Sequence, residues 1–95
     1  MTSKQRAYLR GLANTIDPIF QIGKASLTPE NIKAISDALE KRELIKVSVL
    51  KNCLDDPREI AEVLAERSRA QVVSVIGKKI TLYRKAKKNP KIELP

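Results

Sequence analysis

Two helix starts marked by proline limit the folds that are open to this chain. Thr28-Pro29 and Asp56-Pro57 each combine a residue that caps a helix with a proline suited to its first turn. A short apolar run rich in strand-forming residues precedes each pair, so each helix should follow a strand. Such alternation of strands and helices is typical of helices packed on a sheet that contains parallel strands.

The segment before these starts predicts one helix and one short strand. Thr2 and Gln5 have the spacing of a capping box, and apolar residues then recur at helical spacing, which predicts a helix over about residues 3–14. The run from Pro18 to Ile22 is short, apolar and rich in strand formers, and it predicts the first strand.

The middle of the chain predicts two further helices with a strand between them. The helix that begins at Pro29 should end near Arg42, and the helix that begins at Pro57 should end near Arg69. Residues 44–51 alternate between apolar and more polar positions, as expected of a strand with one solvated face.

The last strand-like runs form a predicted hairpin that completes the fold. Residues 71–76 and 79–83 flank Gly77-Lys78, a pair suited to a type II′ turn. The order is then helix followed by βαβαββ, and the strand-helix-strand units require right-handed crossovers. We therefore expect an α/β (α+β) fold with helices packed on a four-stranded mixed sheet.

The length of 95 residues suits one domain. We place that domain at residues 1–84 and treat residues 85–95 as a basic C-terminal tail with little to bury, although Ile92 and Leu94 could still dock. No apolar run approaches the roughly 20 residues of a membrane span, and the N-terminus lacks the apolar stretch of a secretory signal. Together with a single cysteine, Cys53, this predicts a cytoplasmic protein without a membrane partner.

The residue types argue against an enzyme. The chain has no histidine and one cysteine, so the usual zinc ligand sets and the histidine-based nucleophilic triads cannot be assembled from it. Asp55 and Asp56 are the only adjacent carboxylates, and a helix cap explains them better than acid-base catalysis. Nothing matches a Walker loop or a dinucleotide fingerprint. We expect no catalytic residues, metal, cofactor or small-molecule substrate.

Basic residues are concentrated at the two ends of the chain. The formal net charge is +8, which favours a polyanionic partner such as nucleic acid. Residues 28–66 carry six basic and nine acidic side chains, whereas the two flanking segments carry thirteen basic and two acidic ones. An ordinary solvated surface remains the alternative, but three separate basic segments are what a binding face would need.

The loop Gly23-Lys24-Ala25-Ser26 has the features of a phosphate contact. A glycine and a lysine shortly before a helix place backbone N–H groups, a dipole end and a mobile cation together. A glycine at this place is also common in loops that are only turns. The chain has only three aromatic residues, Tyr8, Phe20 and Tyr83, so it lacks a stacking platform for bases, and recognition should rest on phosphates and shape.

Four motifs, in this order, resemble one family. They are Thr2-Ser-Lys-Gln-Arg, Pro18-Ile-Phe-Gln-Ile-Gly-Lys24, Glu43-Leu-Ile-Lys-Val47 and Val75-Ile-Gly-Lys-Lys-Ile-Thr-Leu-Tyr-Arg84. Together they resemble the bacterial YhbY proteins, stand-alone versions of the CRM domain. The resemblance implies a fold similar to the C-terminal domain of translation initiation factor three, association with precursors of the large ribosomal subunit, and a GxxG loop that touches RNA.

The loop departs from the family pattern at its last position, where Ser26 replaces the second glycine. If that position needs positive φ, serine costs about 1 kcal/mol or more. Alternatively, the serine hydroxyl could donate to a phosphate.

The sequence therefore predicts an RNA-binding, ribosome-assembly protein that contacts structured ribosomal RNA through its phosphates. A module whose basic face docks on an acidic protein is the alternative, and a monomer is the expected state. The predicted contact residues are the loop, Gly23, Lys24, Ala25 and Ser26, and the surrounding cations, Lys4, Arg6, Arg10, Lys46, Lys78, Lys79 and Arg84.

Overall fold

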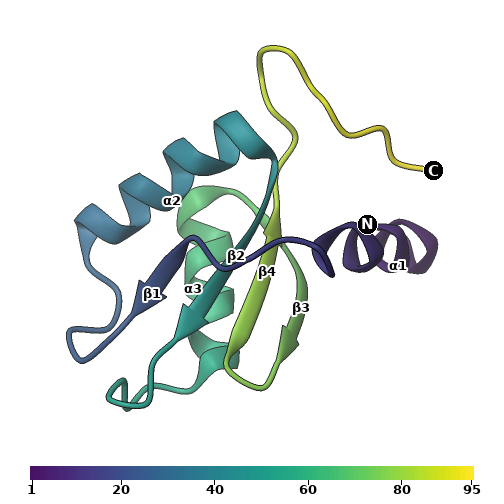
Figure 1. Cartoon of the computed structure of the whole chain (residues 1–95). Helices are drawn as coiled ribbons and strands as arrows, with labels where there is room; N and C mark the ends of the chain where they lie inside the picture. Colours follow the sequence, from purple (N-terminus) through teal and green to yellow (C-terminus); the bar gives the residue numbers. More distant parts are fainter.

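The computed structural model describes all 95 residues as three helices and a four-stranded sheet (Figure 1). In chain order the elements are α1 (Ser3–Ala13), β1 (Phe20–Ile22), α2 (Pro29–Arg42), β2 (Leu44–Val49), α3 (Pro57–Ser68), β3 (Gln71–Ile76) and β4 (Lys79–Tyr83). The predicted α+β fold and its element order are confirmed. None of the helices is both long enough and apolar enough to cross a membrane.

The sheet is mixed, with strand order β1-β2-β4-β3. β1 pairs with β2 in parallel, and β4 runs antiparallel to both of its neighbours, β2 and β3. The predicted hairpin between β3 and β4 is confirmed: Gly77 has a φ of +58° while Lys78 is not in the left-handed region, as a type II′ turn requires. The two parallel strands end at the same edge of the sheet, which brings the loops that follow them together.

Side-chain capping fixes where the helices begin. Thr2 and Gln5 form the predicted capping box on α1, and Thr28 accepts the backbone N–H of Asn31 at the start of α2. Asp56 likewise accepts the N–H of Arg58 at the start of α3. The caps recognised in the sequence therefore set the helix starts.

The first two strands are shorter than predicted. β1 begins at Phe20, not at Pro18, because proline has no N–H to donate. The first hydrogen bond to β2 is donated by the N–H of Ile19 to the carbonyl of Lys46. β2 ends at Val49, because the chain turns at Lys51 after Leu50 donates to the carbonyl of Ile22.

Two cores lie on opposite faces of the sheet. α2 and α3 cover one face, and α3 lies behind the strands in Figure 1. The main core between them consists of twelve buried residues: Ile22, Ile35, Leu39, Ile45, Val47, Val49, Cys53, Ile60, Ala61, Leu64, Ile80 and Leu82. α1 packs on part of the other face and forms the second core, which contains Leu9, Ala13, Leu44, Val73 and Tyr83. No helix covers the rest of that face, where Lys79 is exposed and Lys46 half-buried, although Ser48 and Thr81 on it are buried.

The C-terminal tail is part of the fold. Ile92 and Leu94 pack against the second core, so the docking that the sequence left open is confirmed. The Glu43 carboxylate, which is fully buried, holds the tail in place. Its two oxygens accept the backbone N–H groups of Ala86 at 2.8 Å, Lys91 at 2.6 Å and Ile92 at 2.8 Å.

These hydrogen bonds outweigh the cost of burying a charge. Burial raises the pKa of the Glu43 carboxyl, but the three N–H groups and the charge of Lys91 lower it, and the net result is a pKa below the ordinary value of 4.5. The negative charge of Glu43 also affects Tyr83, its neighbour in the second core. Burial, and to a smaller extent this charge, raise the pKa of the Tyr83 phenol above 10.0. Tyr83 is thus a core residue and not a surface contact.

Replacing this carboxylate tests its role. Glu43→Gln should lower the free energy of unfolding at pH 7 by about 2 kcal/mol or more, since hydrogen bonds to a charged acceptor are lost and an amide N–H₂ group faces donors. Because folding lowers the pKa, Glu43 stabilises the fold above pH 4.5, and this contribution disappears as the pH falls through the lower folded value. The variant should therefore lose part of the acid dependence. Urea unfolding at a series of pH values measures both effects.

Glu93→Gln is the control, because Glu93 is an exposed carboxylate in the same tail. It should change stability by less than about 0.5 kcal/mol. Equal effects of the two substitutions would show that Glu43 does not hold the tail.

Candidate nucleic-acid interface

The loop between β1 and α2 is a tight turn whose last residue takes a left-handed conformation. The Ser26 N–H donates to the Gly23 carbonyl at 2.9 Å, which places Lys24 and Ala25 at the exposed centre of the turn. Ser26 has a φ of 56°, whereas Gly23 has no positive φ, and a Cβ added to Gly23 would meet Asn52 Oδ1 at 3.4 Å, an ordinary contact. The residue of this loop that must adopt a positive φ is therefore Ser26 and not Gly23.

The hydroxyl of Ser26 is engaged inside the protein. It donates to the carboxylate of Asp55, and the Ser26 carbonyl accepts Nδ2 of Asn31 at 3.3 Å. A hydroxyl carries one hydrogen, so in this arrangement Ser26 does not donate to a phosphate. The sequence left two possibilities open for Ser26, a positive φ or a hydroxyl that donates to a phosphate. The structure shows the positive φ.

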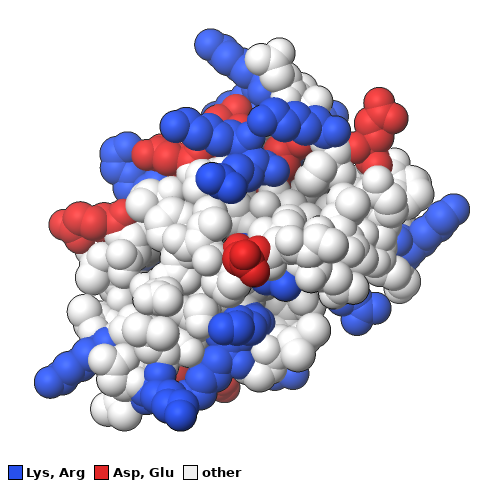
Figure 2. Space-filling model, in the orientation of Figure 1, with Lys and Arg blue, Asp and Glu red and all other residues white.

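The sheet presents lysines on the open face next to this loop. Side chains alternate along a strand, so Lys46 and Ser48 of β2 point away from the main core to which Ile45 and Val47 belong. Ser48 is paired with Lys79 of β4, whose Nζ donates to the Ser48 hydroxyl at 3.1 Å. Lys78, in the hairpin turn, is exposed at the same end of the sheet. Figure 2 shows cations along the lower part of this face.

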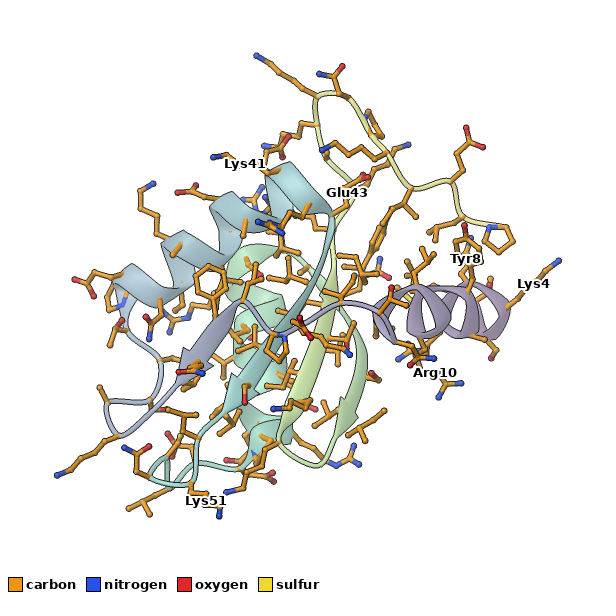
Figure 3. All side chains as sticks on the ribbon, in the orientation of Figure 1. Lys4, Tyr8, Arg10, Lys41, Glu43 and Lys51 are labelled. Carbon is orange, nitrogen blue, oxygen red and sulfur yellow. The ribbon has the colours of Figure 1, made fainter.

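The cations of α1 do not all remain free. The Arg6 guanidinium donates to the carbonyls of Val72 at 3.0 Å and Val73 at 3.4 Å, where a bulge interrupts β3. This contact ties α1 to the sheet. Lys4 and Arg10 are exposed and extend from α1 in different directions (Figure 3).

Arg84 lies at the other end of the molecule and is also engaged. Its guanidinium donates to the Ser36 hydroxyl at 2.9 Å, to the Ser36 carbonyl at 2.7 Å and to the Ser68 carbonyl at 2.7 Å. Glu40 forms an ion pair with it at 3.7 Å. The predicted site thus separates into lysines on three neighbouring segments, Lys24, Lys46, Lys78 and Lys79, and cations that lie elsewhere, Lys4, Arg6, Arg10 and Arg84.

The comparisons with known proteins identify the family of the chain. Residues 1–84 match the CRS1 / YhbY (CRM) domain. The chain belongs to the CRM domain family.

Relatives of this CRM domain cover its whole length. "Probable RNA-binding protein YqeI" of Bacillus subtilis is 50% identical over 95 residues, which is 100% of this chain and 99% of the relative. An "RNA-binding protein" of Haemophilus influenzae is 33% identical, with 100% of this chain and 95% of the relative aligned. The solution structure of SAV1595 from Staphylococcus aureus is 56% identical, has a TM-score of 0.84 and covers 100% of this chain and 99% of its own.

Sequence reasoning missed a second loop at the site of this CRM domain. Residues 50–56 follow β2, and because β1 and β2 are parallel neighbours, this loop lies beside the β1–α2 loop. It contributes Asp55, which binds Ser26, and the exposed cation Lys51, which Figure 3 shows at the lower end of the molecule. The parallel pairing was predictable, and the rule that neighbouring parallel strands end at one edge would have identified both residues.

Two substitutions of Ser26 separate backbone strain from the hydroxyl contact in this CRM domain. Ser26→Gly and Ser26→Ala both remove the hydrogen bond to Asp55, but only alanine keeps a Cβ at positive φ. That conformation costs alanine about 1 to 2 kcal/mol, and the freedom of glycine in the unfolded chain offsets part of the difference. Ser26→Gly should therefore be more stable than Ser26→Ala by about 0.5 kcal/mol or more in urea unfolding. An alanine variant at least as stable as the glycine variant would contradict the positive φ.

Proposed function

We propose that this CRM domain binds ribosomal RNA in precursors of the large ribosomal subunit and acts there as an assembly factor. The observation that carries the proposal is that three neighbouring segments, the β1–α2 loop, β2 and the β3–β4 hairpin, carry four lysines, Lys24, Lys46, Lys78 and Lys79. The names of the relatives support RNA as the partner class, and they support binding over catalysis. The ribosomal partner rests on the resemblance to YhbY proteins.

The arrangement suits contacts with the RNA backbone. Lys24 lies at the tip of a turn that leads into α2, so its ammonium group and the unpaired backbone N–H of Glu30 in the first turn of α2 can approach one phosphate. Lys46 and Lys79 lie on neighbouring strands and present their charges on the adjoining surface. Lysines bind phosphates as mobile point charges, which position a protein on RNA without reading its bases.

The aromatic residues favour folded RNA over a splayed single strand. Tyr83 belongs to the second core, and Phe20 is half-buried against the main core. Tyr8 is 43% exposed, but it lies on α1, away from the loop (Figure 3). One exposed ring does not make the stacking platform that single-strand readers use. Shape and phosphate spacing are then the basis of recognition, as they are for double-stranded RNA.

Reversing the charge of Lys24 tests the proposal. Lys24→Glu should weaken binding to a transcribed fragment of large-subunit ribosomal RNA by more than tenfold, or about 1.4 kcal/mol, because attraction to a phosphate becomes repulsion. The melting temperature should barely change, since an exposed turn residue alters stability by less than about 0.5 kcal/mol. Fluorescence anisotropy at fixed salt measures the affinity.

Arg42→Glu is the matched control, because it makes the same charge change on an exposed residue at the far end of α2. It should weaken binding far less than Lys24→Glu. If Lys24→Glu binds like the parent protein while melting at the same temperature, the loop is only a connection between β1 and α2.

A further inference from the structure

A second group of cations surrounds a hollow at the opposite end of α2 from the loop. The hollow has a volume of about 740 Å³ and lies between the ends of α2 and α3 and the start of the C-terminal tail. No hydrophobic residue lines it. Figure 2 shows the cations of this end at the upper edge of the molecule, with carboxylates between them. Six cations line the hollow: Arg67, Arg69, Arg84, Lys85, Lys87 and Lys88.

The fold fixes the backbone of two of these cations and the guanidinium of a third. One oxygen of Glu40 accepts the backbone N–H groups of Lys87 at 3.0 Å and Lys88 at 3.3 Å. The same carboxylate is paired with Arg84 through its other oxygen at 3.7 Å. The tail backbone is therefore fixed against the end of α2, while the side chains of Lys87 and Lys88 remain exposed.

The charges around the hollow leave it strongly positive. Its two carboxylates already have partners: Asp37 is paired with Lys33 at 3.1 Å, and Glu40 accepts the N–H groups of the tail. Nε of Arg84 is buried and has no hydrogen-bond acceptor, so this arginine retains a donor without a partner. A lining of six cations with no hydrophobic residue suits an anion with many oxygens, which is the chemistry of a phosphate chain.

We propose that this hollow is a second binding site for phosphates of the RNA backbone. It deepens the function proposed above and rests on it. α2 joins the two sites: Glu40, which holds the backbone of Lys87 and Lys88, lies eleven residues after Pro29, or about 16 Å along the helix at a rise of about 1.5 Å per residue. Adjacent phosphates of one strand are much closer together, so the two sites contact separate stretches of backbone, and the domain bridges them.

A bridging protein gains affinity only from RNA that reaches both sites, because the second contact then becomes intramolecular. The test uses two RNA hairpins, one with a stem of about 6 base pairs and one of about 20, longer than the roughly 16 base pairs that a double-strand-binding domain spans. The variant is Lys87→Gln with Lys88→Gln, which removes two charges and keeps the backbone contacts with Glu40.

The double variant should bind the long stem at least fivefold more weakly than the parent and the short stem less than about twofold more weakly. Its slope of log affinity against log salt on the long stem should become shallower by about 1.5, since each lost phosphate contact removes roughly 0.7 to 0.9. The control is Lys41→Gln with Arg42→Gln, which removes the same charge from the last turn of α2 outside the hollow. The control should bind both stems within about twofold of the parent.

Several results would overturn the second site. Equal weakening by the two double variants would show a general effect of charge, and unchanged binding of the long stem by the Lys87 and Lys88 variant would show that the hollow is not used. Lys87→Arg with Lys88→Arg keeps the charge and must bind like the parent, which excludes a folding defect. If Lys24→Glu weakens both stems while the hollow variant weakens neither, the proposed function stands without the second site. If no variant weakens either stem, the proposed function fails as well.

Discussion

The buried carboxylate of Glu43 joins three parts of the molecule that are far apart in the sequence. It lies at the junction of α2 and β2, with a positive φ of 66°. Its side chain accepts three N–H groups of the tail, and its backbone carbonyl accepts the N–H of Arg84 at 2.9 Å. A buried charge and an unfavourable backbone conformation are both costly, and they persist only where surrounding contacts fix them. Through Glu43 the end of α2 determines the path of the tail.

This constraint organises both ends of the molecule. With the tail fixed, Ile92 and Leu94 complete the second core together with α1, which leaves the lower part of the sheet face open. On that part of the face Lys79 is exposed and Lys46 is half-buried. At the other end, the same fixed tail places Lys87 and Lys88 around the hollow. The basic residues near the two ends of the sequence therefore lie mainly at two opposite ends of the folded domain.

Most of the fold could be predicted, because its signals are local. Thr28-Pro29 and Asp56-Pro57 start their helices through caps within a few residues, and the Gly77 turn fixes the hairpin. The site was less predictable, since a basic residue type does not reveal what its side chain meets. Arg6 and Arg84 were predicted as part of the RNA-binding field, but their guanidinium groups bind carbonyls from β3 and from α2 and α3. The contact between Ser26 and Asp55 joins residues 29 positions apart and left no local signal.

Crosslinking in growing cells is the most direct test of phosphate-mediated RNA binding, with the attached RNA sequenced and the crosslinked peptides mapped. Precursors of large-subunit ribosomal RNA should dominate the recovered RNA, and the crosslinked peptides should contain the loop at Lys24 and the strands that carry Lys46 and Lys79. Lys24→Glu should reduce the recovery in parallel with its loss of affinity. The account would be contradicted if the parent protein yielded no more crosslinked RNA than Lys24→Glu and still retained an acidic protein partner after nuclease treatment.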